Sequence, residues 1–163
     1  MELKHQQLCI CISLLILCVL IIWSCYPKRV GPIGPDRKQL TWDEMNIDQR
    51  KTHMESLVLP RATKLFRTWQ PKRFDDVSCN LCHDIGRSTE NFHMPASHLP
   101  RLSGDWTLSP EFEKYPDTTK LKLDRLIPLM SEALGKKSFS VITRRGFGCY
   151  SCHLGPSGPM FGH

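Results

Sequence analysis

The 163-residue chain lacks the short motifs that mark several common classes of protein. It has no glycine-rich phosphate-binding loop, no hydrolase triad pattern and no basic patch of the kind that binds nucleic acid. It also lacks a recognisable signalling or partner-binding module. Nucleotide-dependent enzymes, hydrolases and nucleic-acid-binding proteins are therefore poor explanations of this sequence.

After residue 25 the chain has no cysteine outside two short motifs. The eight cysteines divide into an N-terminal group (Cys9, Cys11, Cys18, Cys25) and two C-x-x-C-H motifs, Cys79–His83 and Cys149–His153. No cysteine is left for an ordinary disulfide unless the motifs themselves supply it. The chemistry of the protein therefore depends on what these two motifs do.

The N-terminus differs from the rest of the chain. Residues 8–23 are almost wholly apolar and follow Lys4 and His5, a pattern typical of a secretory signal or membrane anchor. The run is shorter than the roughly 20 residues that span a bilayer, although tilting or thinning accommodates shorter segments. It ends in "IWSC", which loosely resembles a bacterial lipoprotein signal with Cys25 as the lipidated residue. An uncleaved anchor, a lipoprotein and a cleaved soluble form all stay open.

We expect three regions: a signal or anchor over 1–25, a linker over 26–40 and one domain over 41–163. The linker prediction rests on the many prolines, glycines and charges of "YPKRVGPIGPDRKQ". The net charge of +6 favours acidic partners or anionic membrane surfaces, and it is equally typical of ordinary solubilising charge.

Zinc and dithiol chemistry explain the motifs incompletely. A four-cysteine zinc site usually has about 15–20 residues between its two pairs, whereas 66 residues separate Cys82 from Cys149. A thioredoxin-like dithiol needs a single C-x-x-C at a strand-to-helix turn. Neither site requires a histidine directly after both pairs.

Covalent haem attachment explains every residue of the motifs. A single helical turn lets both thiols bond to the vinyl groups of one porphyrin, and the adjacent histidine becomes the proximal iron ligand. Attachment occurs on the exported side of a membrane, in agreement with the N-terminal segment. We therefore predict two covalently attached haem c groups, bound by Cys79, Cys82, His83, Cys149, Cys152 and His153. Without haem, a domain organised around metal centres is expected to fold poorly.

A weak internal repeat bears on the remaining iron ligands. "LVLPRATKLF" precedes the first motif and "RLIPLMSEALG" precedes the second. A first helix is expected to start at Thr41, with Glu44 completing a capping box. A second, over about residues 118–134, has an apolar stripe, a kink at Pro128 and a C-cap at Gly135.

The sixth ligands are predicted from this repeat. Met130 lies on the apolar stripe and is favoured for the second haem, ahead of Met160 and His163, although a core methionine is the usual outcome on such a face. Ala62 occupies the corresponding position in the first repeat. The first haem is therefore assigned to Met94 in the extended "FHMPASHLP" segment. The other sixth-ligand candidates outside the motifs are Met54 or His53, then His93, with Met45 and His98 further behind.

Together, "CNLCH", "CYSCH" and the order of Met130 before the second motif resemble multihaem c-type cytochromes. That order is similar to the haem-binding repeat of the cytochrome subunit of photosynthetic reaction centres, in which a methionine on the preceding helix is the sixth ligand. The resemblance, over residues 42–155, also includes small exported dihaem cytochromes. It implies a mainly α fold: a small dihaem domain with long loops, little or no sheet and an N-terminal membrane-anchor helix. Two motifs make at most half of a reaction-centre subunit, so no photosynthetic role is inferred.

The resulting hypothesis is a membrane-anchored dihaem electron carrier, not an enzyme. It would relay electrons between redox proteins, or within a membrane electron-transfer complex, on the periplasmic or extracytoplasmic side. Two alternatives stay open: a dihaem peroxidase and a haem-based sensor, each with one open haem face. No nucleic acid is expected among its partners.

Overall fold

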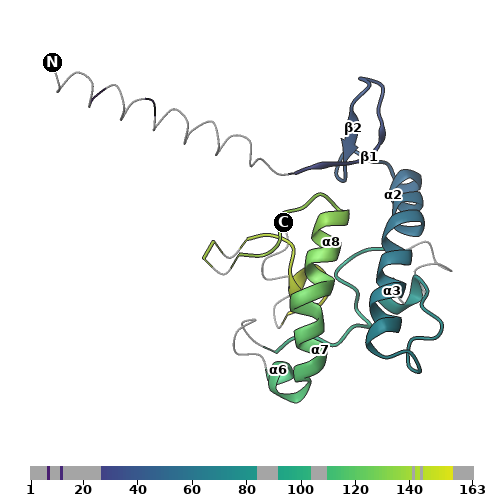
Figure 1. Cartoon of the computed structure of the whole chain (residues 1–163), viewed down its shortest axis with the longest axis vertical. Helices are drawn as coiled ribbons and strands as arrows, with labels where there is room; N and C mark the ends of the chain where they lie inside the picture. Colours follow the sequence, from purple (N-terminus) through teal and green to yellow (C-terminus); the bar gives the residue numbers. More distant parts are fainter. Residues whose placement is uncertain are drawn as a thin grey trace.

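A computed structural model of the protein describes residues 27–83, 92–103, 110–140, 142–143 and 145–155, together with Gln7 and Ile12. These residues are mostly helical and include one two-stranded sheet, which agrees with the mainly α prediction (Figure 1). No helix in this part of the chain is long and apolar enough to cross a membrane. The predicted anchor over 1–25 lies outside the described residues, apart from Gln7 and Ile12.

Most of the segment predicted to be a linker forms a β-hairpin. Strand β1 (Arg29–Ile33) pairs antiparallel with strand β2 (Gln39–Thr41). The connecting turn is closed by the Gly34 amide, which donates to the Lys38 carbonyl at 2.8 Å, and Arg37 takes a φ of 62° within it. Gly31, Pro32, Gly34 and Pro35 therefore belong to a folded turn and its strands, and the linker prediction is corrected for residues 29–40.

The hairpin packs against the rest of the molecule. The Lys28 amide donates to the Gly135 carbonyl at 2.8 Å, which joins the start of the hairpin to the end of a distant helix. Met45 lies beneath Gly31 and is only 3% exposed. Met45, a distant candidate for an iron ligand, is thus part of the packing under the hairpin.

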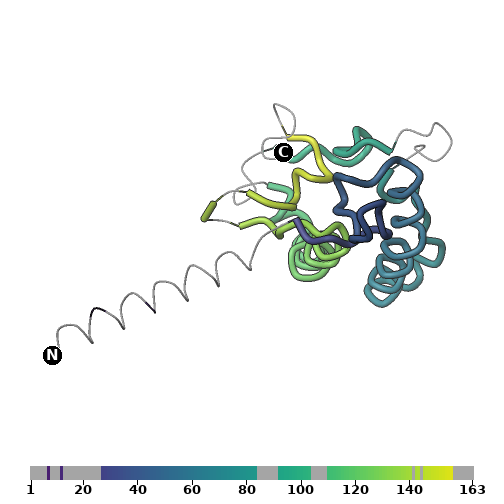
Figure 2. The backbone as a smooth tube through the Cα atoms, turned by 90° about the horizontal axis from the view of Figure 1, so that it is seen from above, coloured from purple at the N-terminus to yellow at the C-terminus, as the bar shows by residue number. Residues whose placement is uncertain are grey.

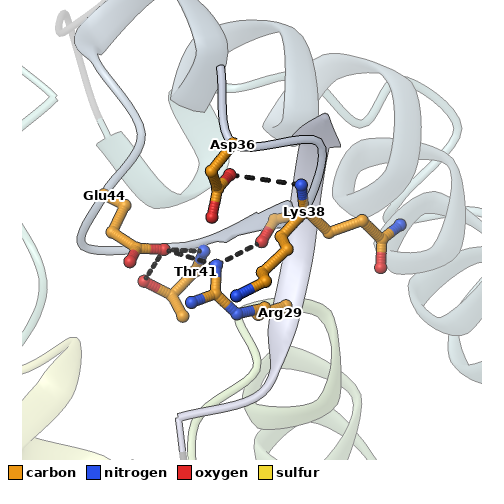
Figure 3. A network of polar contacts seen from close by, with 6 residues as sticks. Arg29, Asp36, Lys38, Thr41 and Glu44 are labelled. Carbon is orange, nitrogen blue, oxygen red and sulfur yellow. Dashed lines mark hydrogen bonds and ion pairs between the residues drawn. The ribbon is translucent and has the colours of Figure 1, made fainter. Parts of the chain in front are cut away.

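A polar network joins the hairpin to the turn that follows it (Figure 3). The Glu44 carboxylate accepts hydrogen bonds from the Thr41 amide at 2.7 Å and the Thr41 hydroxyl at 2.9 Å. Arg29 donates to the same carboxylate at 3.3 Å and to the Gln39 carbonyl at 2.7 Å. Both strands and the turn after β2 are thereby held together.

The predicted Thr41–Glu44 contact forms, but it does not start a helix. Helix α2 (Ile47–His53) begins later, with Asn46 as its N-cap. The Asn46 side chain accepts from the Gln49 amide at 2.9 Å, and the Gln49 side chain accepts from the Asn46 amide at 3.0 Å. This second pair is the capping box of the helix, so the predicted helix start is wrong.

Two long helical rods form the main body of the described structure. The first consists of α2, the π-helical turn η1 (Met54–Val58) and α3 (Leu59–Trp69). The second consists of α7 (Pro116–Leu121), the π-helical turn η2 (Lys122–Leu126) and α8 (Ile127–Ala133), preceded by the short helix α6 (Pro110–Lys114). The second rod matches the predicted helix closely, and Gly135 follows it with the left-handed φ of 61° expected of a C-cap.

Each rod contains its π-helical turn just before a proline. The Leu59 amide donates to the Met54 carbonyl, and the Ile127 amide donates to the Lys122 carbonyl, so each bond spans five residues. Pro60 and Pro128 follow directly. Proline has no amide hydrogen and its ring clashes with the carbonyl four residues earlier, and a wider turn relieves both problems. The two halves of the sequence repeat therefore share a structural feature.

The rods lie side by side and antiparallel, so that α3 contacts η2 and α8 contacts η1 (Figures 1 and 2). A small core of Ala62, Phe66 and Phe74 lies at the α3 end, with the two phenylalanine rings 4.8 Å apart. At the other end the buried His53 ring joins the rods through Nε2, 2.7 Å from the Ala133 carbonyl. The cysteine motifs follow the rods in sequence.

Candidate cofactor-binding site

The two C-x-x-C-H motifs fold into the same hydrogen-bonded turn. In the first, which includes α4 (Asn80–His83), the amides of Cys82 and His83 both donate to the Cys79 carbonyl, at 3.2 and 3.0 Å. In the second, which includes η3 (Cys149–Ser151), the corresponding amides donate to the Cys149 carbonyl at 3.2 and 2.9 Å. Each motif is therefore one helical turn, as covalent attachment of two thiols to one porphyrin requires.

The four thiols are free, and Cys82 of the first motif lies near Cys149 and Cys152 of the second, since all three act on Lys122. Burial raises the pKa of the Cys152 thiol to about 12, and the charge of the neighbouring Cys82 thiolate adds to the shift. Burial also raises the pKa of Cys82 and Cys149. These thiols are protonated at neutral pH. Within the described residues, no three His, Cys, Asp or Glu side chains are grouped as ligands for a bare metal ion.

His153 is fixed in one orientation and one tautomer. Its Nδ1 lies 2.8 Å from the Pro100 carbonyl, which can only accept, so Nδ1 carries the proton and Nε2 has the free lone pair. Burial, followed by the charge of Lys122, lowers the pKa of His153 and favours the neutral ring. A neutral imidazole with Nδ1 bonded to a carbonyl is the form that binds a metal through Nε2.

His83 contains a buried nitrogen without a partner. Its Nδ1 is inaccessible to solvent and makes no hydrogen bond, although a buried ring nitrogen is normally satisfied. The ring meets Phe92 edge-on with centroids 5.6 Å apart. Burial, then the charge of His98, lowers the pKa of His83, and a hydrogen bond to the Phe92 backbone partly opposes the shift. The neutral ring of His83 is therefore favoured, and its unpartnered nitrogen is Nδ1, whereas in His153 Nδ1 is bonded to a carbonyl.

The loop over 92–103 joins the two motifs. Phe92 packs on His83 at one end of this loop. Further along, the Ala96 amide donates to the Cys152 carbonyl at 3.1 Å, and the Leu102 amide donates to the Leu154 carbonyl at 2.9 Å. Met94 is half-buried within the loop, so it lies in a segment that contacts both motifs and not the first alone.

Lys122 is the site residue that the sequence analysis missed. It opens η2, and its Nζ lies 3.3 Å from Nε2 of His153. Because Nδ1 of that ring is the donor to Pro100, the lysine donates to Nε2. Burial lowers the pKa of Lys122, and attraction to Cys152, Cys149 and Cys82 opposes this shift. The one sequence feature that points to Lys122 is its position in the internal repeat, where it corresponds to Met54.

The other sequence candidates lie in varied settings. Met130 is half-buried on α8 and Met54 is half-buried in η1. His53 is engaged with the Ala133 carbonyl, and His93 and His98 are exposed. Met160, His163 and Cys25 lie outside the described residues.

The donor set fits haem c at both motifs. Each has two thiols on one helical turn and a neutral histidine next to the second thiol. Comparison of the chain with protein-family models, with curated proteins and with solved structures found no match.

Proposed function

We propose that the protein is a dihaem c-type cytochrome that relays electrons and is anchored to the membrane by its N-terminus. The observation that carries this proposal is the pair of matching turns, in which the second cysteine and the histidine bond to the carbonyl of the first cysteine. Such a turn directs two thiols and one imidazole to one side. Neither a zinc site nor a dithiol site requires a histidine directly after each cysteine pair.

The haem iron would supply one-electron chemistry, alternating between ferric and ferrous states. The chain's own contribution is to hold the two groups next to each other. The loop over 92–103 contacts both motifs, and Cys82 of the first motif lies near Cys152 of the second. Two attachment sites that adjoin suit a relay between an electron donor and an acceptor.

The axial ligands would set the potential of each haem. His83 and His153 are the proposed proximal ligands, each held neutral by burial. Met94 and Met130 are the sixth ligands proposed from the sequence, and a His/Met pair gives a higher potential than a bis-His pair.

The proposed location is the exported side of the membrane, since haem c is attached there. The net charge of +6 suits redox partners with acidic docking surfaces, because opposite charges speed association at low salt. A partner of this kind would show association rates that fall as ionic strength rises.

The test is the haem content of the full chain produced with a haem c maturation system. We expect two haems per chain by pyridine haemochrome analysis, with a mass increase to match. The double variants Cys79→Ala/Cys82→Ala and Cys149→Ala/Cys152→Ala should each retain one haem. Cys18→Ser, a cysteine outside the motifs, is the matched control and should retain both.

The same preparation separates a carrier from an enzyme or sensor. Two low-spin haems that do not bind carbon monoxide support an electron carrier. A high-spin haem that binds carbon monoxide or turns over peroxide would instead identify a peroxidase or a sensor. A chain that carries no haem in an active maturation system refutes the proposal.

A further inference from the structure

Lys122 has its amine directly against the proposed iron ligand of the second motif. Its Nζ lies 3.3 Å from Nε2 of His153, and the ring cannot turn away because Nδ1 is bonded to the Pro100 carbonyl at 2.8 Å. The nitrogen that faces Lys122 is the one with the free lone pair. The amine therefore occupies the approach by which iron would bind His153.

The distance is close to that between two donors on opposite faces of one metal. A metal–imidazole bond is about 2 Å long, so two nitrogens across one metal lie roughly 4 Å apart. Nζ of Lys122 and Nε2 of His153 are 3.3 Å apart, so they would have to separate by less than one bond length to bind the same metal. An iron atom bound to His153 must either expel the amine or bind it.

We propose that the Lys122 amine is the sixth iron ligand of the haem carried by Cys149–His153. This inference rests on the proposed function, because it requires haem at the second motif. Coordination uses the lone pair of the neutral amine, so binding releases one proton to solvent.

The repeat supports the position independently of that contact. Lys122 is the first residue of η2, and Met54 is the first residue of η1. In both turns the carbonyl of this residue accepts from the amide five positions later. A thioether, a known ligand of haem iron, thus stands in the first rod where the amine stands in the second.

The experiment compares the ferric full-length holoprotein with three variants and a control. Lys122→Ala removes the amine, Lys122→Met replaces it with the side chain found at the matching position, and Met130→Ala removes the competing candidate. Lys120→Ala is the control, because Lys120 is an exposed lysine on the same rod that pairs with Asp124 at 2.7 Å. The measurements are near-infrared magnetic circular dichroism, electron paramagnetic resonance and haem content.

We expect half of the haem in Lys122→Ala to become high-spin and to bind added imidazole, with two haems still attached. Lys122→Met should stay low-spin and gain a thioether–iron charge-transfer band. Met130→Ala and Lys120→Ala should keep the wild-type spectra. Unchanged spectra in both Lys122 variants, or a high-spin haem in Met130→Ala alone, would overturn the inference. A wild-type chain without haem would instead overturn the proposed function itself.

Discussion

His53, His83 and His153 are the same residue type with three different sets of partners. His53 bridges the two rods through the Ala133 carbonyl. His153 is held between the Pro100 carbonyl and the Lys122 amine, and His83 has a buried nitrogen with no partner. The surroundings, and not the residue type, separate the histidine that joins the rods from the two histidines of the motifs.

Removing the His53 ring should destabilise the fold and leave the haems unchanged. In His53→Ala the buried Ala133 carbonyl loses its partner, and an unsatisfied buried acceptor costs about 1–3 kcal/mol. Urea unfolding of the holoprotein should show this loss, while the exposed His98→Ala control should stay near the wild-type value. A change in haem spin state in His53→Ala would show that this histidine is an iron ligand after all.

The spacing of residues in the sequence predicts the turn of each motif, but it does not predict the contact of Lys122. The cysteines and histidines of each motif lie within five positions, so the sequence alone indicated one turn, and the backbone bonds agree. The contact between Lys122 and His153 spans 31 positions and depends on how η2 packs against the second motif. No local pattern encodes such a contact, and that is why Lys122 was missed.

At the level of elements, the β1–β2 hairpin should respond to acid through Glu44. Hydrogen bonds from Thr41, backbone first and then side chain, lower the pKa of Glu44 below its ordinary value of 4.5. A lowered pKa means that the ionised form favours the folded hairpin. The stabilisation is therefore fully present above pH 4.5 and is lost as the pH falls through the lowered pKa.

Proton NMR of the reduced holoprotein between pH 2 and 6 measures this response at the Thr41 amide. We expect that amide to shift with a midpoint below 4.5. Glu44→Gln should abolish the shift, and Glu132→Gln, a change at an exposed residue of α8, should preserve it. A midpoint above 4.5 would contradict the predicted sign.

Gly135 should tolerate no side chain. Its φ of 61° is left-handed, and an added Cβ would lie against the Lys28 carbonyl. The backbone conformation alone costs an ordinary residue about 1–2 kcal/mol, and the clash with backbone adds to it. Gly135→Ala should lose at least that much in urea unfolding. Gly34→Ala is the control, because its Cβ would meet the flexible end of Leu40; equal losses in both variants would contradict this account.

The sequence pattern predicts the second rod but not the hairpin. The second rod was predicted well because an apolar stripe and a terminal glycine are local features of a helix. The hairpin was missed because proline and glycine occur both in linkers and in turns, and strand pairing between Arg29 and Thr41 is not local. The Thr41–Glu44 pair formed its predicted contact without a helix, so the capping motif alone did not define a helix start.

At the level of the whole molecule, the chain provides a small core of its own. The buried cluster consists of Ala62, Phe66 and Phe74, and no side chain in the described residues is less than 2% exposed. The loop over 92–103 is held to the second motif by backbone hydrogen bonds and the ring of His153, and it meets the first motif through the rings of Phe92 and His83. Two haems packed against these turns would add the apolar surface that the chain lacks.

A haem-free chain should therefore be far less stable than the holoprotein. The variant Cys79→Ala/Cys82→Ala/Cys149→Ala/Cys152→Ala prevents attachment while removing only sulfur atoms. A domain of this size has about 5–15 kcal/mol of stability, and we expect this variant to lose most of it because the buried surface against the haems is absent.

Limited proteolysis and amide hydrogen exchange should show rapid cleavage and weak protection in residues 92–103 and 145–155. The rods should keep part of their helical circular dichroism, since His53 and the phenylalanine cluster join them without haem. If the haem-free variant resisted protease as well as the holoprotein, the core would be complete without haem, and the motifs would need another explanation.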